Sequence, residues 1–174
     1  DATNKVITTN STTKLSHAMP SGYGANFTVE LWVKLPTAGI YVQSAAMYTG
    51  GGFINYIQAP GTNDDLQFAS YTGTTDYYNP TVDVSVGVWH QIVQSYNSNV
   101  RYGWIDGSSV ATSTRGSGRT AAGANASIDY GFLPWGSSNS FVLDLGIIRV
   151  YTDTLTNAEV LHNYDANKSD FGLS

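Results

Sequence analysis

A strand pattern runs directly into a helix pattern at the C-terminal end of this chain, which is an unusual ending for a β-rich sequence. Residues 141–151 are mostly apolar and β-branched, which predicts a strand. Thr156 and Glu159 then have the spacing of a capping box, in which each side chain bonds a backbone N–H at the start of the same helix. Leu155 and Val160 stand where a hydrophobic staple would fix the entry of the chain. We therefore expect a closing strand followed by one short helix.

The remainder of the chain predicts short strands separated by turns. Residues 27–34 alternate apolar and polar side chains, the pattern of a half-buried strand, and residues 40–44 are its expected partner. Residues 89–96 and 100–105 predict a hairpin, and Asp106-Gly107 supplies the next tight turn, because a two-residue loop needs positive φ. Further strands are expected at 53–57, 66–71, 110–114 and 127–132. About ten short strands with one terminal helix predict an all-β fold, a two-sheet antiparallel sandwich.

Four motifs in order along the chain resemble one known family. Residues 27–34 (FTVELWVK) are similar to its Phe-Thr-Ile-Glu-x-Trp-Val-Lys, and residues 89–96 to its Trp-His-x-Val-x-x-x-Tyr. Residues 103–107 (GWIDG) are similar to Leu-Tyr-Val-Asp-Gly, with Gly103 in place of an aliphatic residue. Residues 141–164 are similar to its closing strand and helix, with Ile147 where Glu is common. The family is the laminin-G-like jelly rolls of the concanavalin A-like lectin/glucanase superfamily. The resemblance implies one jelly-roll domain over residues 1–174. Residues 1–16 are rich in Ser, Thr and Asn and weakly patterned, which makes them a candidate N-terminal arm.

The last residues carry a second, narrower resemblance. The stretch from Glu159 to Leu173 resembles a tail that recurs in jelly-roll proteins of tailed bacteriophages and other viruses, with Asp170 where Arg is usual. This resemblance implies a protein of the virion surface.

Charge and composition exclude several classes of partner. Only 12% of residues are charged and the net charge is −5, so the chain lacks the clustered Lys and Arg that neutralise phosphates, and we expect no nucleic-acid partner. No apolar run is long enough to span a membrane, so we expect no membrane as a partner. The absence of cysteine rules out disulfides and thiolate metal sites.

The acidic residues do not form a hydrolytic pair. Retaining glycosidases hold two carboxylates about 5 Å apart across the scissile bond. This chain has two glutamates, Glu30 and Glu159, in separate predicted elements, and no predicted strand carries acids at i and i+2. The three histidines have no metal-ligand spacing, and His90, in the Trp-His motif, is expected to be structural. We therefore predict that the protein is not an enzyme.

The most acidic loop of the chain has two interpretations, a calcium site or an ordinary turn. Many jelly rolls of the resembled superfamily hold Ca²⁺ in acidic loops through carboxylate and carbonyl oxygens. The candidate ligands are Asn63, Asp64 and Asp65 in one dense loop, with Asp144 in the last strand. The competing interpretation, which we favour, is that Asn-Asp-Asp only builds a turn.

Aromatic side chains near polar loops are the candidate binding residues, because sugar rings stack their C–H faces on Trp and Tyr. The candidates for glycan or partner binding are Trp135, Tyr71, Tyr77, Tyr78, Tyr48 and Tyr56. Each tyrosine also suits a sandwich core or a protein interface, so both roles stay open. Trp32, Trp89 and Trp104 lie within regular strands and are expected to be structural.

Together these observations predict a non-enzymatic structural protein of the virion surface, such as a capsid decoration protein or fibre module, with glycan binding as a candidate activity. The expected partners are capsid or other virion proteins, further copies of the chain as a homo-oligomer, and polysaccharide. The alternative is a secreted carbohydrate-binding module or lectin domain of a bacterial surface or polysaccharide-degrading protein. A cell-surface adhesion domain is the third class.

Overall fold

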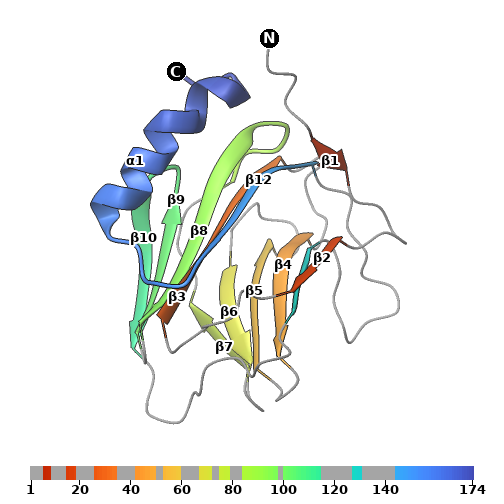
Figure 1. Cartoon of the computed structure of the whole chain (residues 1–174), viewed down its shortest axis with the longest axis vertical. Coiled ribbons are helices and arrows are strands. Elements are labelled where there is room, and N and C mark those ends of the chain that lie inside the picture. Colours follow the sequence, from red (N-terminus) through yellow and green to blue (C-terminus); the bar gives the residue numbers. More distant parts are fainter. Residues whose placement is uncertain are drawn as a thin grey trace.

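The computed structural model describes residues 6–8, 15–18, 26–34, 42–49, 53–59, 67–71, 75–78, 84–97, 100–114, 127–130 and 144–174. These residues form two antiparallel sheets of six strands each and one helical segment at the C-terminal end (Figure 1). The expected all-β sandwich with one short C-terminal helix is thereby confirmed.

The two sheets are interleaved along the chain. Sheet I contains, in spatial order, β1 (Ile7–Thr8), β12 (Asp144–Tyr151), β3 (Asn26–Lys34), β8 (Trp89–Asn97), β9 (Val100–Ile105) and β10 (Ser108–Thr114). Sheet II contains β2 (Leu15–Ala18), β11 (Ser127–Tyr130), β4 (Val42–Thr49), β5 (Phe53–Ala59), β6 (Gln67–Tyr71) and β7 (Thr75–Tyr78). The helical segment consists of α1 (Asn157–Asn167) and the 3-10 turn η1 (Lys168–Phe171). Figure 1 shows α1 against one side of sheet I, with sheet II on the other side.

One expected strand pairing is wrong. The strand predicted over residues 40–44 was expected to pair with β3, but β4 lies in sheet II between β11 and β5. The partners of β3 are β12 and β8. The chain changes sheets after β3, and both true partners come much later in the sequence, β12 more than a hundred residues away, so local pattern could not identify them.

The central strand β3 is buried on both faces, although its alternation predicted one exposed face. The apolar face is no more than 4% exposed and lies toward sheet II; it consists of Phe27, Val29, Leu31 and Val33. On the opposite face, Glu30 and Trp32 are each 0% exposed, because α1 and η1 cover them. The helix therefore turns the polar face of this strand into a second buried layer.

The helix begins where the capping box predicted. The Thr156 hydroxyl accepts from the Glu159 N–H at 3.3 Å, and the Glu159 carboxylate accepts from the Thr156 N–H at 2.8 Å. The Glu159 carboxylate accepts from both the N–H and the hydroxyl of Thr156, and these two bonds hold the pKa of the Glu159 carboxyl below its usual value, the backbone bond having the larger effect. Val160 is fully buried against Val93 and Trp104, and the half-buried Leu155 packs on the same cluster, which confirms the predicted staple.

The predicted Asp-Gly turn connects β9 and β10 and also receives the helix. Asp106 has φ 51° and Gly107 has φ 75°, the left-handed values that such a turn needs. The Gly107 N–H donates to the Gln91 side chain at 3.2 Å. A Cβ on Gly107 would lie 2.9 Å from Leu161 Cδ1, so glycine is required here both by the backbone and by the helix above it.

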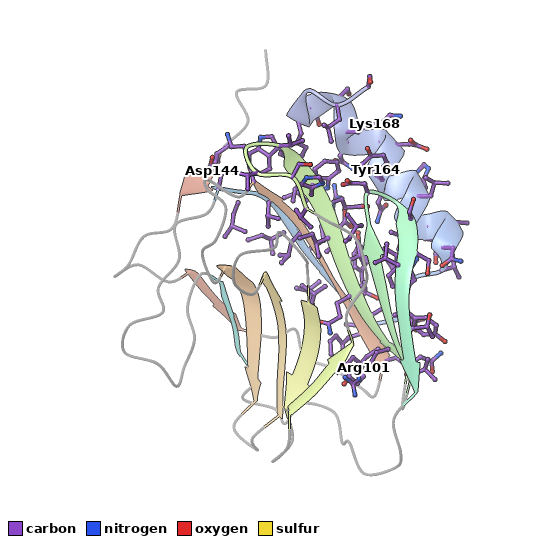
Figure 2. The ribbon with its side chains drawn as sticks, turned by 180° about the vertical axis from the view of Figure 1, so that it is seen from behind. Arg101, Asp144, Tyr164 and Lys168 are labelled. Carbon is purple, nitrogen blue, oxygen red and sulfur yellow. The ribbon has the colours of Figure 1, made fainter. Side chains whose placement is uncertain are left out.

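An aromatic stack fixes the C-terminal end of the helical segment. Trp32 lies between Tyr164 and Phe171, with ring centroids 5.8 and 4.4 Å away and nearly parallel planes. Phe171 also contacts Trp89, at 4.8 Å between centroids. Gly146 leaves the space for Phe171, because a Cβ there would lie 2.5 Å from the phenyl ring. Figure 2 shows Tyr164 and Lys168 on the helical segment beside sheet I, whereas Arg101 lies at the far end of the sheet.

Candidate functional site

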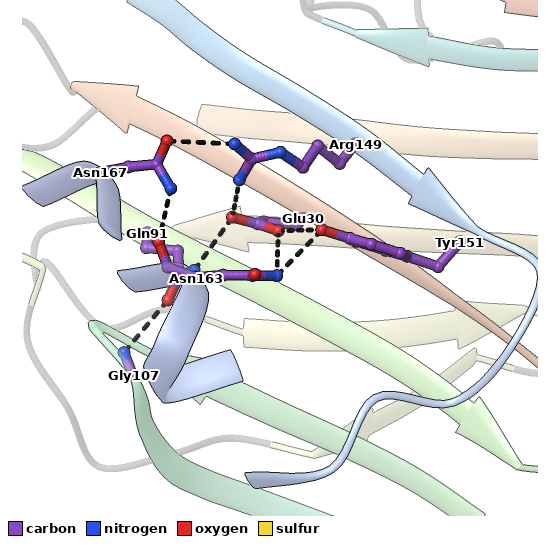
Figure 3. A network of polar contacts seen from close by, with 7 residues as sticks. All are labelled: Glu30, Gln91, Gly107, Arg149, Tyr151, Asn163 and Asn167. Atoms are coloured by element: carbon purple, nitrogen blue, oxygen red, sulfur yellow. Dashed lines mark hydrogen bonds and ion pairs between the residues drawn. The ribbon is translucent and has the colours of Figure 1, made fainter. Parts of the chain in front are cut away.

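The most connected polar group of the described side chains is the carboxylate of Glu30 (Figure 3). One oxygen accepts from Arg149 at 2.8 Å and from Gln91 at 3.0 Å. The other accepts from the Tyr151 hydroxyl at 2.8 Å and from the Asn163 amide at 3.0 Å. Four donors from two strands of sheet I and from α1 therefore converge on one buried anion, which we call the Glu30 network.

The helix is tied to the Glu30 network at two further points. Arg149 also donates to Asn167 Oδ1 at 3.0 Å, and the Asn167 amide donates to the Asn163 carbonyl at 2.6 Å. The carboxylate is completely buried and both oxygens are fully engaged, so Glu30 has no lone pair or solvent path to offer a substrate. Its role is to dock the helix on the sheet, not to perform acid–base chemistry.

Ionisation of Tyr151 limits the stability of the Glu30 network at high pH. Burial, followed by the hydrogen bond to Glu30, raises the pKa of the Tyr151 phenol from 10.0 to about 12. The raised pKa favours the neutral phenol in the folded state. The corresponding stability is complete below pH 10 and is lost as the pH rises through about 12.

His90 belongs to a second polar cluster, at the Asp106 turn. Its Nδ1 lies 2.7 Å from Asp106 Oδ2, while Asp106 Oδ1 accepts from the Gln91 N–H at 2.9 Å. This geometry holds the turn against β8 and supports the structural role predicted for His90. Among the described residues, no group of three acidic or histidine side chains could hold a metal ion.

The strand register of sheet II brings four predicted binding residues to one face. Tyr48 of β4 pairs with Ile54, which pairs with Tyr71 of β6. Tyr56 of β5 pairs with Ala69, which pairs with Tyr77 of β7. Directly opposed residues share a face, and so do residues two apart along a strand. The two rows therefore lie side by side on one face, which we call the tyrosine face: Tyr48, Tyr56, Tyr71 and Tyr77.

A row of glutamines follows the two tyrosine rows on that face. Gln43 pairs with Gln58, and Gln58 pairs with Gln67, across β4, β5 and β6. The register of β4 shifts between Gln43 and Ala45, and this irregularity brings Gln43 into line. Sequence reasoning missed these three residues, since only the pairing of the strands reveals the row.

The other predicted site residues are divided by the structure. Trp135, Asn63, Asp64 and Asp65 lie outside the described residues, so the binding role of the tryptophan and the calcium site stay predictions. Tyr78 pairs with Phe68, which places it on the face opposite the tyrosine face.

Asp144 is the one candidate calcium ligand whose side chain the structure describes. Its Oδ2 lies 3.1 Å from the Lys34 ammonium, which is itself 5.4 Å from the Trp89 ring centroid. A cation at Asp144 would compete with this ammonium group.

Two interleaved antiparallel sheets with a capped C-terminal helix define a lectin-like jelly roll. The chain belongs to the concanavalin A-like lectin/glucanases superfamily, whose family model matches residues 4–161. No curated protein sequence is significantly similar to it.

Solved structures show the same fold at low sequence identity. The native heptameric SAP-like pentraxin from Limulus polyphemus has a TM-score of 0.69 at 15% identity, covering 85% of this chain and 73% of that one. Domain 4 of AbnA, an extracellular arabinanase from Geobacillus stearothermophilus, was solved in complex with arabinotriose. It has a TM-score of 0.65 at 19% identity, and the match covers 83% of this chain and 70% of that one. The binding domain of Paraclostridial Mosquitocidal Protein 1 has a TM-score of 0.68 at 13% identity; this chain covers 42% of its length and 92% of its own. No helix among the described residues is long and apolar enough to cross a membrane.

Proposed function

We propose that this protein is a non-catalytic glycan-binding domain and that the tyrosine face of sheet II is its binding surface. The observation that carries the proposal is the register that brings Tyr48, Tyr56, Tyr71 and Tyr77 onto one face across four adjacent strands. Tyrosine rings offer a flat apolar surface to the C–H faces of a sugar and a hydroxyl to its polar edge. The neighbouring glutamines add donors and acceptors for sugar hydroxyls.

The composition of the two faces of sheet II supports this choice of surface. Opposite the tyrosine face, the register places His17, Asn55 and Asp76 together with most of the large apolar residues of the sheet, which are Leu15, Met47, Phe53, Ile57, Phe68 and Ile128. This apolar majority suits the interior of the sandwich. Apart from Ile54, the tyrosine face carries tyrosine, alanine and hydrogen-bonding residues, which suit a surface in water.

We expect Tyr71→Thr to weaken binding to the best ligand of a neutral-glycan array by about tenfold, the factor that corresponds to 1.4 kcal/mol. Threonine keeps the β-propensity of the site but removes the ring. The matched control is Tyr71→Phe, which keeps the ring and should retain most of the affinity by calorimetry.

The same Tyr71→Thr variant tests whether the tyrosine face is exposed. On a solvent face, the substitution should change the free energy of unfolding by no more than about 0.5 kcal/mol, whereas loss of a core aromatic ring would cost about 3 kcal/mol. A large loss of stability, or unchanged glycan binding, would contradict the proposal.

A second candidate function is attachment to a virion surface, as a capsid decoration protein or fibre module. The observation that favours it is the resemblance of the segment from Glu159 to Leu173 to the tails of virion proteins. On this proposal the protein forms a homo-oligomer or binds a capsid lattice. The native mass of the purified chain, alone and mixed with candidate capsids, should then exceed 18.7 kDa. A stable monomer that does not bind capsids would leave the secreted glycan-binding domain as the better proposal.

A further inference from the structure

We infer that the ligand of the tyrosine face is a linear, uncharged glycan in an extended conformation, lying across the strands and covering about four sugar units. This inference rests on the proposed function and specifies its ligand class. It is drawn from three properties of sheet II: the spacing of the tyrosines, the absence of basic residues in its strands, and the glutamine row on one side.

The spacing of the tyrosines fits a chain that runs perpendicular to the strands. One tyrosine stands on each of four consecutive strands, in the order Tyr48, Tyr56, Tyr71 and Tyr77. Adjacent strands lie about 4.8 Å apart, so the track from the first tyrosine to the fourth is about 14 Å long. One pyranose unit of an extended glycan advances by nearly the distance between two strands. Each successive sugar would therefore meet one further tyrosine.

The tyrosines alternate between two rows of the strand register. Tyr48 and Tyr71 share one row, and Tyr56 and Tyr77 share the next, two residues or about 7 Å away along the strands. The intervening register positions are Ile54 in the first row and Ala69 in the second. Tyrosines at alternating register positions suit an extended glycan, because its successive units present alternating edges.

The charge of the strands of sheet II favours an uncharged ligand over an anionic one. Its six strands contain no lysine or arginine, and the tyrosine face carries one charged residue, Asp129 of β11, beyond the Tyr48 end of the track. Sulfated, uronic or sialylated glycans need cationic partners to offset the loss of hydration of their charge. The net charge of −5 adds a weak repulsion of such ligands.

The glutamine row lies beside only one of the two tyrosine rows. Gln58 and Gln67 neighbour Tyr56 and Ala69 along their strands, on the side away from Tyr48 and Tyr71. Their amides can donate to and accept from ring hydroxyls on that side of the glycan, which is the recognition that uncharged sugars offer.

The test is a length series measured by calorimetry on the full chain. The probes are cello-, xylo- and manno-oligosaccharides of one to six units, which are extended and uncharged, with malto-oligosaccharides as helical and oligogalacturonides as anionic comparisons. In at least one extended series, we expect affinity to rise by about tenfold from the disaccharide to the tetrasaccharide and then to level off. The helical and anionic series should bind more weakly.

Variants at the two ends of the track sharpen this test. Tyr48→Thr or Tyr77→Thr should reduce tetrasaccharide affinity to that of the trisaccharide and leave disaccharide affinity unchanged, whereas Tyr48→Phe and Tyr77→Phe should retain the gain. Thermal unfolding of each variant shows whether it is folded.

The outcomes separate the inference from the proposed function. Affinity that is already complete with one unit, or that is highest for the anionic or helical series, would overturn the extended neutral ligand but keep glycan binding. Absence of binding to every probe and to a broad glycan array would overturn both.

Discussion

Glu30→Ala is expected to lower the free energy of unfolding by about 3 kcal/mol. The substitution removes the acceptor of four hydrogen bonds and leaves donors of Arg149, Tyr151 and Asn163 facing one another without an anion. Breaking a buried ion pair by removing one partner costs about 3–5 kcal/mol, and the low end applies here because the Arg149 side chain is 35% exposed and can regain water. The loss should be concentrated on the docking of α1.

Glu159→Ala is the matched control, since these are the two glutamates of the chain. Glu159 is exposed and bonds only within the capping box, so its loss should cost less than about 1 kcal/mol. Chemical denaturation gives both free energies. Hydrogen exchange of the α1 amides should show faster opening in Glu30→Ala than in Glu159→Ala. Equal costs for the two variants would mean that the Glu30 network does not hold the helix.

Local chemistry determined the features of this fold that the sequence predicted. The capping box of Thr156 and Glu159 and the left-handed turn at Asp106-Gly107 each depend on residues a few positions apart, and both were predicted correctly. The role of Glu30 was not predicted. Its partner Asn163 lies 133 residues away, so the alternation of β3 could indicate only a polar face. Burial of that face depends on where the helix docks, which is a tertiary property.

For the candidate site, the sequence indicated the type of residue but not its placement on one face of the sheet. Tyrosine as a sugar-stacking residue could be proposed from composition, and four of the proposed tyrosines do share a face. Which four could not be predicted, because a shift of register by one residue would move a strand's whole set to the other face. Tyr78 shows the limit, since it follows Tyr77 directly and lies on the opposite face. The glutamine row needed both the pairing of three strands and the irregularity after Gln43.

Phe171→Ala is expected to be as damaging as the loss of Glu30, at about 3 kcal/mol or more. The Phe171 side chain is 9% exposed, stacks on Trp32 and makes a tilted contact with Trp89, so its removal opens a cavity between the last helical turn and sheet I. Gly146→Ala is expected to cost about 2 kcal/mol for the opposite reason, because its methyl group would enter the space of the phenyl ring.

The two substitutions should compensate each other when combined. The atoms that a methyl group on residue 146 would strike are Cε1 and Cζ of Phe171, at 2.5 and 2.7 Å, and alanine at 171 has neither. In the Phe171→Ala background, Gly146→Ala should therefore cost nothing or restore part of the lost stability, by filling some of the cavity. A double-mutant cycle of unfolding free energies measures this coupling, which we expect at about 2 kcal/mol. Additive costs would show that Gly146 is required by its backbone and not by the ring, and the docking of Phe171 would then need another explanation.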